Sequence, residues 1–193
     1  MFVAPAAAVR AVRGAVTTGK HREPVWIFAY GSLMWEEGLP FVSQKVPATL
    51  LGYRRSLCLY SWHYRGSRVQ PGLVLGLERC QEASACLCVG AALRVEEADV
   101  EDALHYFDRR ELISNIYTRE SVALEPFGGK DGIAGAQMPA YAYVADPAGP
   151  QYAGELGLHE AAALVAAGTG SRGSALEYLS ASVRALRRQG VRE

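Results

Sequence analysis

The chain contains 193 residues, of which half are hydrophobic and 21% are charged, and this ordinary globular balance supports one domain or two small ones. Its 20 Lys and Arg residues balance its 20 Asp and Glu residues, which argues against nucleic acid as a main partner because binding phosphates requires clustered excess cations. Apolar runs stay shorter than the roughly 18 residues that a membrane-spanning helix needs, so we expect no membrane insertion.

The first 24 residues differ in composition from the rest of the chain. They are rich in Ala and Val, and their charged residues are basic up to Glu23. This composition superficially resembles an organelle-targeting peptide, but the segment contains little Ser, which such peptides favour. We therefore predict a flexible N-terminal arm over residues 1–24 and a single folded domain over residues 25–193. Because no secretory signal is convincing, we expect a cytoplasmic protein.

Segments of β-forming residues, separated by turns rather than by helices, dominate residues 25–95. Such connections favour an antiparallel or mixed sheet over a doubly wound parallel one, in which helices join the strands. The predicted strands are Val25–Tyr30, Thr49–Tyr60 with a bulge at Gly52, Leu73–Leu77 and Ala85–Val95.

The first predicted strand runs directly into a turn that contains Gly31 and Ser32. Glycine lets the backbone approach other atoms closely, so a buried strand that ends in such a turn can direct several backbone N–H groups at one point. That point would suit a carboxylate or a developing oxyanion. Most turns of this kind are only turns, so the sequence makes this one a candidate site.

Helical periodicity begins after residue 95, and the chain as a whole is predicted to have an α+β fold. In the last helix, Ser174 and Glu177 match a capping box, and a stripe formed by Leu176, Leu179 and Leu186 together with Val183 is expected to be buried. The predicted elements are a helix over Glu96–Leu112, strands over Tyr117–Leu124 and Ala140–Val144 that a Gly-rich loop separates, and helices over Leu158–Ala167 and Ser174–Arg188.

Glu111 lies on the apolar face of the first predicted helix. Val100 and Phe107 share that face by the 3.6-residue period, and Glu111 follows Val100 by eleven residues. A partly desolvated carboxylate has a raised pKa, which suits a group that acts as a general base and then as a general acid near neutral pH. Two other interpretations stay open: Arg109 or Arg110 pairs with Glu111, or the helix ends one turn earlier.

Two further residues are candidates for substrate contacts. Arg65 lies in a loop punctuated by Gly and Pro, where its planar guanidinium could bind a carboxylate, although a lone arginine in a loop is more often solvated. Tyr143 shares one side of a predicted strand with Tyr141 and could present a phenol to a site, although paired tyrosines on a sheet usually serve packing.

The cysteines do not form a zinc pattern. Cys80, Cys86 and Cys88 could offer three soft ligands, but zinc sites usually use Cys-x-x-Cys with a matching second pair, which this sequence lacks. We therefore expect these residues and Cys58 to be reduced thiols that act as small core residues, as is usual in the cytosol.

Several segments, in chain order, carry a family resemblance: WIFAYGSLMW at 26–35, GYRRSLCL at 52–59, HYRGSRVQPGLVLGL at 63–77, RRELISNIY at 109–117, AYAYVADP at 140–147 and GTGSRGSALEYL at 168–179. Together they resemble the ChaC-like gamma-glutamylcyclotransferases. The first segment is shared with wider cyclotransferase-like proteins, whereas the Arg-Gly and Pro-Gly block, the Arg-Glu pair and the late Glu-Tyr-Leu are more specific.

The resemblance implies a mixed, barrel-like β-sheet with flanking helices. It also implies an enzyme that releases 5-oxoproline from glutathione, with cysteinylglycine as the second product, and that needs neither a cofactor nor a metal. The catalytic carboxylate maps to Glu111, and we predict that Arg65 and Tyr143 contact the remainder of the substrate. The glutamyl-binding loop maps to Ile27, Phe28, Ala29, Tyr30, Gly31, Ser32 and Leu33.

Two departures from the family pattern leave alternatives open. Ala29 replaces a common Gly, and its methyl group should fit if the residue keeps strand angles. Ser114–Tyr117 replaces a Gly-Gly-Tyr or similar sequence, so other gamma-glutamyl amines or amino acids stay as alternative substrates. A non-catalytic module that binds a gamma-glutamyl ligand is a further alternative. Neither charge nor composition sets the oligomeric state.

Overall fold

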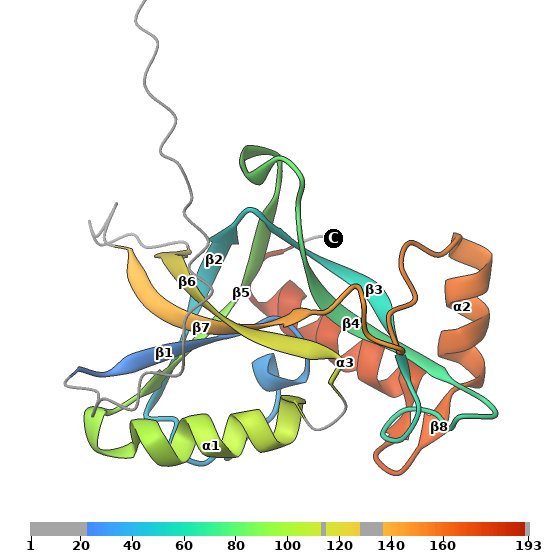
Figure 1. Cartoon of the computed structure of the whole chain (residues 1–193), viewed down its shortest axis with the longest axis horizontal. Coiled ribbons are helices and arrows are strands. Elements are labelled where there is room, and N and C mark those ends of the chain that lie inside the picture. Colours follow the sequence, from blue (N-terminus) through green and yellow to red (C-terminus); the bar gives the residue numbers. More distant parts are fainter. Residues whose placement is uncertain (1–22, 113–114, 128–136, 192–193) are drawn as a thin grey trace, which may run out of the picture.

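The computed structural model describes residues 23–112, 115–127 and 137–191 (Figure 1). Within them, five strands close into a barrel in the order β1-β5-β2-β6-β7. β1 pairs antiparallel with β5 and parallel with β7, so the sheet is mixed, and the expected α+β fold with a mixed, barrel-like sheet is confirmed. The barrel strands are β1 (Val25–Ala29), β2 (Gln44–Leu51), β5 (Leu87–Val95), β6 (Tyr117–Pro126) and β7 (Met138–Ala145).

Two of the predicted features lie outside the described residues. They are most of the N-terminal arm, residues 1–22, and the Gly-rich loop, which falls within residues 128–136. Ser114, which belongs to one of the departures from the family pattern, also lies outside them.

A second, two-stranded sheet extends from the barrel toward α2 (Leu158–Ala167), as Figure 1 shows. It pairs β3 (Tyr53–Ser61) antiparallel with β4 (Gly72–Arg79). The single strand predicted over Thr49–Tyr60 is therefore wrong. The chain breaks at Gly52, whose φ of 84° lies in the left-handed region that favours glycine.

β1 is buried on both of its faces. Ile27 and Ala29 belong to the core cluster that includes α1 (Val100–Glu111), whereas Phe28 and Tyr30 belong to the cluster formed by the other barrel strands. Successive side chains of a strand point to opposite faces, so both clusters hold β1 in place. The turn that follows it is therefore attached to the most enclosed strand end of the barrel.

α1 lies along one side of the barrel, below the strands in Figure 1. A short 3-10 turn, η3 (Glu97–Asp99), precedes it, and this turn accounts for the earlier helix start that we predicted. Val100 and Phe107 are fully buried in the barrel core, which confirms the predicted apolar face. The last residue of α1 is Glu111, so this face carries the carboxylate to the end of the helix.

α3 (Ala175–Arg188) starts with the predicted capping box. The Ser174 hydroxyl accepts a hydrogen bond from the Glu177 N–H, and the Glu177 carboxylate accepts one from the Ser174 N–H. Leu176, which we expected in the buried stripe, is 54% exposed, so that expectation is wrong. Tyr178 is buried in its place because it packs toward the turn after β1.

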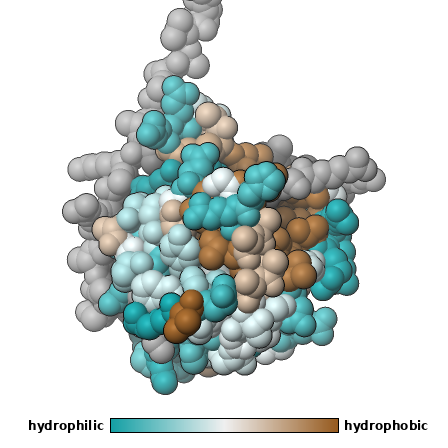
Figure 2. Space-filling view, turned by 90° about the vertical axis from the view of Figure 1, so that its right-hand side faces the viewer, coloured by the Kyte–Doolittle hydropathy of each residue, from teal (hydrophilic) through white to brown (hydrophobic). Residues whose placement is uncertain are grey.

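α2 has the predicted bounds but buries little of its surface, with Val165 as its buried residue. The helix is rich in Ala. Figure 2 shows the side of the molecule on which α2 lies, and hydrophobic residues gather on this side. Among the described residues, no helix is both long and apolar enough to span a membrane. The remaining short elements are η1 (Ser32–Met34), η2 (Ala83–Ala85), β8 (Thr169–Gly170) and β9 (Gly173–Ser174).

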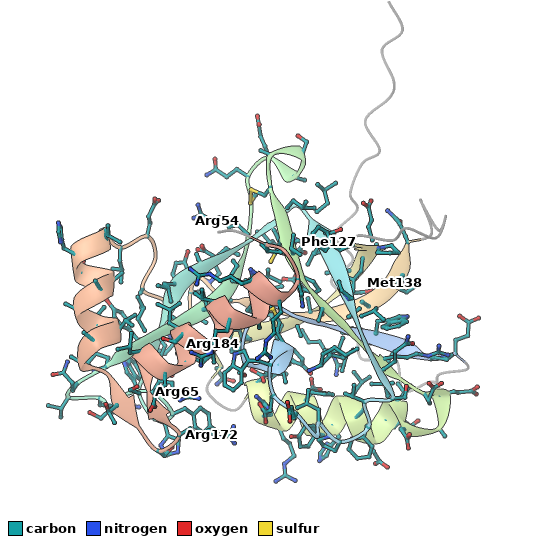
Figure 3. The ribbon with its side chains drawn as sticks, turned by 180° about the vertical axis from the view of Figure 1, so that it is seen from behind. Arg54, Arg65, Phe127, Met138, Arg172 and Arg184 are labelled. Atoms are coloured by element: carbon teal, nitrogen blue, oxygen red, sulfur yellow. A yellow bond between two sulfur atoms is a disulfide. The ribbon has the colours of Figure 1, made fainter. Side chains whose placement is uncertain are left out.

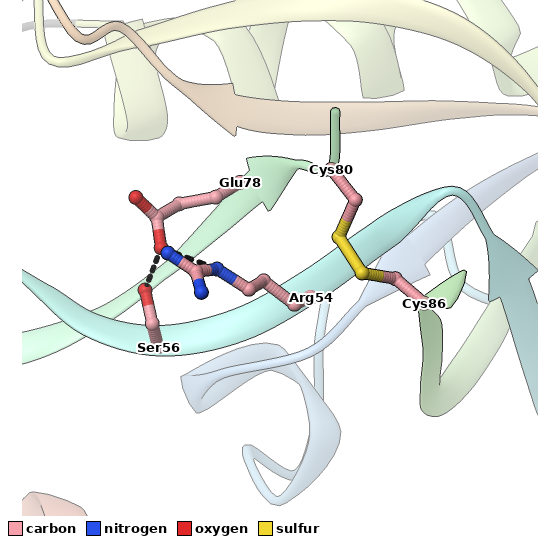
Figure 4. Close-up of a disulfide and its surroundings, with 5 residues drawn as sticks. All are labelled: Arg54, Ser56, Glu78, Cys80 and Cys86. Carbon is pink, nitrogen blue, oxygen red and sulfur yellow. Dashed lines mark hydrogen bonds and ion pairs between the residues drawn. A yellow bond between two sulfur atoms is a disulfide. The ribbon is translucent and has the colours of Figure 1, made fainter. Parts of the chain in front are cut away.

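Cys80 and Cys86 form a disulfide, which corrects the expectation of reduced thiols at these positions (Figure 4). Cys58 and Cys88 are buried and do not take part in this disulfide, as expected for small core residues. Cys86 was predicted inside a strand, but β5 begins at the next residue. Cys86 therefore lies in the connection between β4 and β5, where it faces Cys80 at the end of β4.

We predict that the disulfide stabilises the connection between β4 and β5 and that a Cys80→Ser/Cys86→Ser variant loses its contribution. The cross-link joins residues six positions apart, and closing so short a loop contributes about 2 kcal/mol in the chain-entropy model. Thermal denaturation of the wild type with dithiothreitol should match the variant, and dithiothreitol should leave the variant unchanged. A wild-type melting temperature that does not respond to the reductant would contradict the assignment.

Candidate active site

The turn after β1 forms the start of the 3-10 helix η1. The Met34 N–H donates to the Gly31 carbonyl at 3.0 Å, and the Trp35 N–H donates to the Ser32 carbonyl at 3.1 Å. The first N–H groups of a helix have no acceptor within the helix, and they carry a partial positive charge. Gly31, Ser32 and Leu33 line a cavity of about 40 Å³ together with Glu111. The turn therefore borders the same small cavity as the predicted catalytic carboxylate.

Position 31 requires glycine because a larger residue has no room there, and not because its backbone angle is unusual. Its φ is −122°, which other residues adopt readily, but a Cβ at this position would lie 2.9 Å from the hydroxyl oxygen of Tyr178. Tyr178 is only 7% exposed and comes from α3, so it has little room to retreat. The backbone at Gly31 therefore makes the close approach that we expected, and the group that it approaches is the side chain of Tyr178 in the last helix.

The residues of the predicted glutamyl-binding loop divide into two groups. Gly31, Ser32, Leu33, Tyr30 and Phe28 line the small cavity, with Phe28 almost fully buried. Ile27 and Ala29 line neither of the two cavities beside Glu111, because their side chains pack in the core. Ala29 keeps its place in β1, where it pairs with β5, so its methyl group fits as the sequence suggested.

Glu111 lines both the small cavity and a larger one of about 550 Å³. Its side chain is 18% exposed. Burial raises the pKa of its carboxyl, and Arg110 opposes that effect through an ion pair of 2.8 Å. Glu111 therefore both pairs with an arginine and lies in a cavity, although we considered these two interpretations as alternatives in the sequence analysis.

Arg110 connects the end of α1 to the turn after β1. Its guanidinium makes a bidentate contact with Glu36, at 2.9 and 2.6 Å, and donates to the Ser32 hydroxyl at 2.9 Å. Its Nε donates to Glu111 in addition. Such forked contacts fix geometry as well as charge. The sequence analysis named Arg110 only as a possible partner of Glu111 and missed Glu36, because the two residues lie 74 positions apart.

The Tyr143 hydroxyl is bound to a carboxylate of α1. It donates to Asp108 at 2.8 Å, and Asp108 also forms an ion pair with Arg119 at 2.6 Å. The ring of Tyr143 still lines the small cavity, and its carbonyl accepts from the Tyr30 hydroxyl at 2.7 Å. Tyr143 thus holds α1 against the barrel, and its hydroxyl is already engaged.

Two other tyrosines, which the sequence analysis did not single out, line both cavities together with Glu111. They are Tyr117, at the start of β6, and Tyr178 of α3. Burial raises the pKa of both phenols, so they remain protonated hydrogen-bond donors at neutral pH. Both residues belong to segments that carry the family resemblance, and this was the signal that could have found them.

Arg65 lines the larger cavity, in the loop between β3 and β4. Its guanidinium lies 5.5 Å from the centre of the Tyr178 ring, and its Nη1 donates to the Ser174 carbonyl at 3.4 Å. Arg172 lines the same cavity, and Figure 3 shows both arginines at the end of the molecule where α3 begins. The structure therefore places Arg65 and Glu111 on the same cavity and adds a second arginine.

The architecture is shared with solved gamma-glutamylcyclotransferases. A crystal structure of a yeast gamma-glutamyl cyclotransferase specific to glutathione superposes with a TM-score of 0.78 at 18% identity, covering 89% of this chain and 90% of that one. A structure described as a gamma-glutamyl cyclotransferase gives a TM-score of 0.52 at 13% identity, covering 88% and 82%. Identities this low establish the likeness of fold alone.

Sequence comparison gives the family. The model of the ChaC-like protein family matches residues 25–193, and the chain belongs to this family. The glutathione-specific gamma-glutamylcyclotransferase of Escherichia coli is 31% identical over 170 residues, covering 88% of this chain and 68% of the relative. The human glutathione-specific gamma-glutamylcyclotransferase 1 is 32% identical over 157 residues, covering 81% and 67%.

We predict that Gly31→Ala destabilises the protein because the added methyl group overlaps with the Tyr178 hydroxyl. Overpacking of this kind typically costs about 1 to 3 kcal/mol. Urea denaturation should show that loss, and the loss should be smaller when Gly31→Ala is made in a Tyr178→Phe background. Gly157→Ala is the matched control, because a Cβ there has nothing within 4 Å. Equal costs of Gly31→Ala in the two backgrounds would contradict the assigned contact.

Proposed function

We propose that this chain is a glutathione-specific gamma-glutamylcyclotransferase that converts glutathione into 5-oxoproline and cysteinylglycine. The observation that carries the proposal is that the partly buried carboxyl of Glu111 shares a cavity with Gly31, Ser32 and Leu33 of the turn after β1. The named activity of the Escherichia coli and human relatives supports the choice of substrate. The larger cavity, of about 550 Å³, lies within the range of about 300 to 1,000 Å³ that is usual for small-molecule sites.

The reaction is internal to the substrate. The α-amine of the glutamyl group attacks the γ-carbonyl carbon, a five-membered ring closes, and the bond to the cysteine nitrogen breaks. No cofactor, metal or external nucleophile is required by this chemistry. The main task of the protein is to hold the bent conformer, and good intramolecular geometry can lower the barrier by about 7 to 11 kcal/mol.

Glu111 moves the proton in this mechanism. The α-amine is an ammonium group at neutral pH and has no lone pair until it gives a proton to the Glu111 carboxylate. After the ring closes, the protonated carboxyl gives this proton to the departing amide nitrogen, which would otherwise leave as a strongly basic anion. The regenerated carboxylate then takes the second proton, which the ring nitrogen must lose to become the lactam N–H, and passes it to the released amine. A raised pKa suits both steps, because the carboxyl must accept and release a proton near the working pH.

The amides of residues 31–33 stabilise the negative oxygen of the tetrahedral intermediate or the glutamyl carboxylate. Removing one such donor typically costs about 3 to 4 kcal/mol in the transition state. The phenols of Tyr117 and Tyr178 can donate from the opposite wall. Ile27, Ala29 and Tyr143 serve in this proposal as supports of the turn and of α1 rather than as contacts of the substrate.

The proposed location is the cytoplasm, where thiol pools keep most cysteines reduced. Cys80 and Cys86 would exchange between thiol and disulfide forms there. Neither residue lines the cavities that contain Glu111, so catalysis should proceed in both forms.

Glu111→Gln is expected to fold normally and to lose turnover by about 100-fold or more, as removal of a general acid–base group does. The measurement is 5-oxoproline released from glutathione, with a gamma-glutamyl amino acid as a parallel substrate. Glu101→Gln, an exposed acid on the same helix, is the matched control and should keep the wild-type rate. Near-wild-type release by Glu111→Gln would refute the mechanism. Preferential release from the gamma-glutamyl amino acid would refute glutathione specificity.

The acid limb of the pH profile reports Glu111. Burial raises the pKa of this carboxyl and the charge of Glu36 adds to the rise, so kcat/KM should fall with decreasing pH at an apparent pKa above the ordinary value of about 4.3. Glu36→Gln removes a negative charge and should move the limb to lower pH. Glu37→Gln, an exposed neighbour, should leave it in place. A limb at the ordinary glutamate value in the wild type would contradict the assigned role.

A further inference from the structure

Arg172 is an exposed residue that lines the larger cavity. It lies in the turn between β8 and β9, and its N–H donates to the Tyr64 carbonyl at 3.0 Å. Its guanidinium lies 4.7 Å from the centre of the Tyr64 ring. Within the described part of the chain, this guanidinium has no ion pair and no hydrogen bond to an acceptor. Its charge is therefore available to a ligand in the cavity that it lines.

A second cation lies on the same wall. Arg65 lines this cavity too. Burial lowers the pKa of the Arg65 guanidinium, and the positive charge of Arg172 also lowers it. The acids of this region are already engaged, because Glu177 accepts from the Ser174 N–H in the capping box and the two acids of the cavity, Glu36 and Glu111, form ion pairs with Arg110. Two guanidinium groups without a dedicated carboxylate between them create a positive field in a partly enclosed space, and such a field attracts an anion.

Contacts between backbones fix the two arginines. A Cβ on Gly72 would lie 2.0 Å from the Arg65 carbonyl oxygen, and a Cβ on Gly170 would lie 2.4 Å from the His63 carbonyl oxygen. A Cβ on Gly168 would lie 2.3 Å from the Gly72 Cα. The loops that carry the arginines therefore pack against each other without side chains between them. A site held in this way loses little freedom when it binds an anion.

We propose that Arg172 is a specificity-determining residue that binds the C-terminal carboxylate of the substrate, with Arg65 on the same anion. This inference rests on the proposed function, since it concerns the end of the substrate remote from Glu111. In glutathione that group is the glycyl carboxylate. Two extended residues span at most about 7 Å, and Glu111, Arg65 and Arg172 line one cavity, so a single substrate can contact Glu111 at one end and the arginines at the other.

The test compares glutathione with its glycyl ethyl ester, which keeps the gamma-glutamyl and cysteinyl groups but lacks the charge. The wild type should prefer glutathione by about 10- to 100-fold in kcat/KM, as expected for one charge-assisted contact. Arg172→Gln should lose this factor on glutathione, mainly through KM, and change little on the ester. Arg172→Lys should recover part of the loss.

Arg68→Gln is the matched control. Arg68 lies in the same region and also stacks 4.7 Å from an aromatic ring, that of Trp62, but it does not line the cavity. This variant should behave as the wild type on both substrates. Equal losses of Arg172→Gln on glutathione and on the ester would overturn the proposal, as would a wild type that does not distinguish them.

A binding measurement tests this proposal independently of the proposed function. Calorimetry in the Glu111→Gln background measures affinity for glutathione and for the ester without turnover. Weaker binding of glutathione, but not of the ester, after adding Arg172→Gln supports the carboxylate contact even if the wild type releases no 5-oxoproline. Unchanged glutathione affinity after this substitution overturns it even if the enzyme is active.

Discussion

The site depends on one arginine that holds two carboxylates. Arg110 binds Glu36 through both terminal nitrogens and Glu111 through its Nε, so it joins the last turn of α1 to the turn after β1. Without this cation, two partly buried acids would face each other uncompensated, an arrangement that is strongly destabilising. The same contact sets the chemistry of Glu111. Burial raises the pKa of its carboxyl and Arg110 pulls it back, which leaves a group that can both take and give a proton.

The fold gathers the residues of the site, which lie far apart in the sequence, around the end of β1. The barrel closes through a parallel contact between β1 and β7, and this closure buries the strand that leads into the turn. α1 carries Glu111 to one side of the turn, and α3 places the Tyr178 hydroxyl against Gly31. The glycine-packed loops then carry the arginines to the open side of the larger cavity. The barrel thus holds the turn and Glu111 in place, and the loops add the positive charges of the two arginines.

Features fixed by neighbours in sequence could be predicted, whereas features fixed by distant contacts could not. The 3.6-residue period placed Glu111 on the buried face of α1, and the capping box at Ser174 marked the start of α3. The period did not reveal that Tyr178, rather than Leu176, faces inward, because the turn after β1 decides this. The Cys80–Cys86 bond and the break at Gly52 depended on where the chain passes from one sheet to the other. The contact between Glu36 and Arg110 spans 74 positions and left no local pattern.

The most direct measurement is a crystal structure of the Glu111→Gln variant with intact glutathione bound. We expect the substrate α-amine nitrogen within about 3 Å of the side chain at position 111, and the γ-carbonyl oxygen facing the amides of residues 31–33. A gamma-glutamyl group lodged between Arg65 and Arg172, with its amine remote from position 111, would contradict the central claim that Glu111 moves the proton that closes the ring.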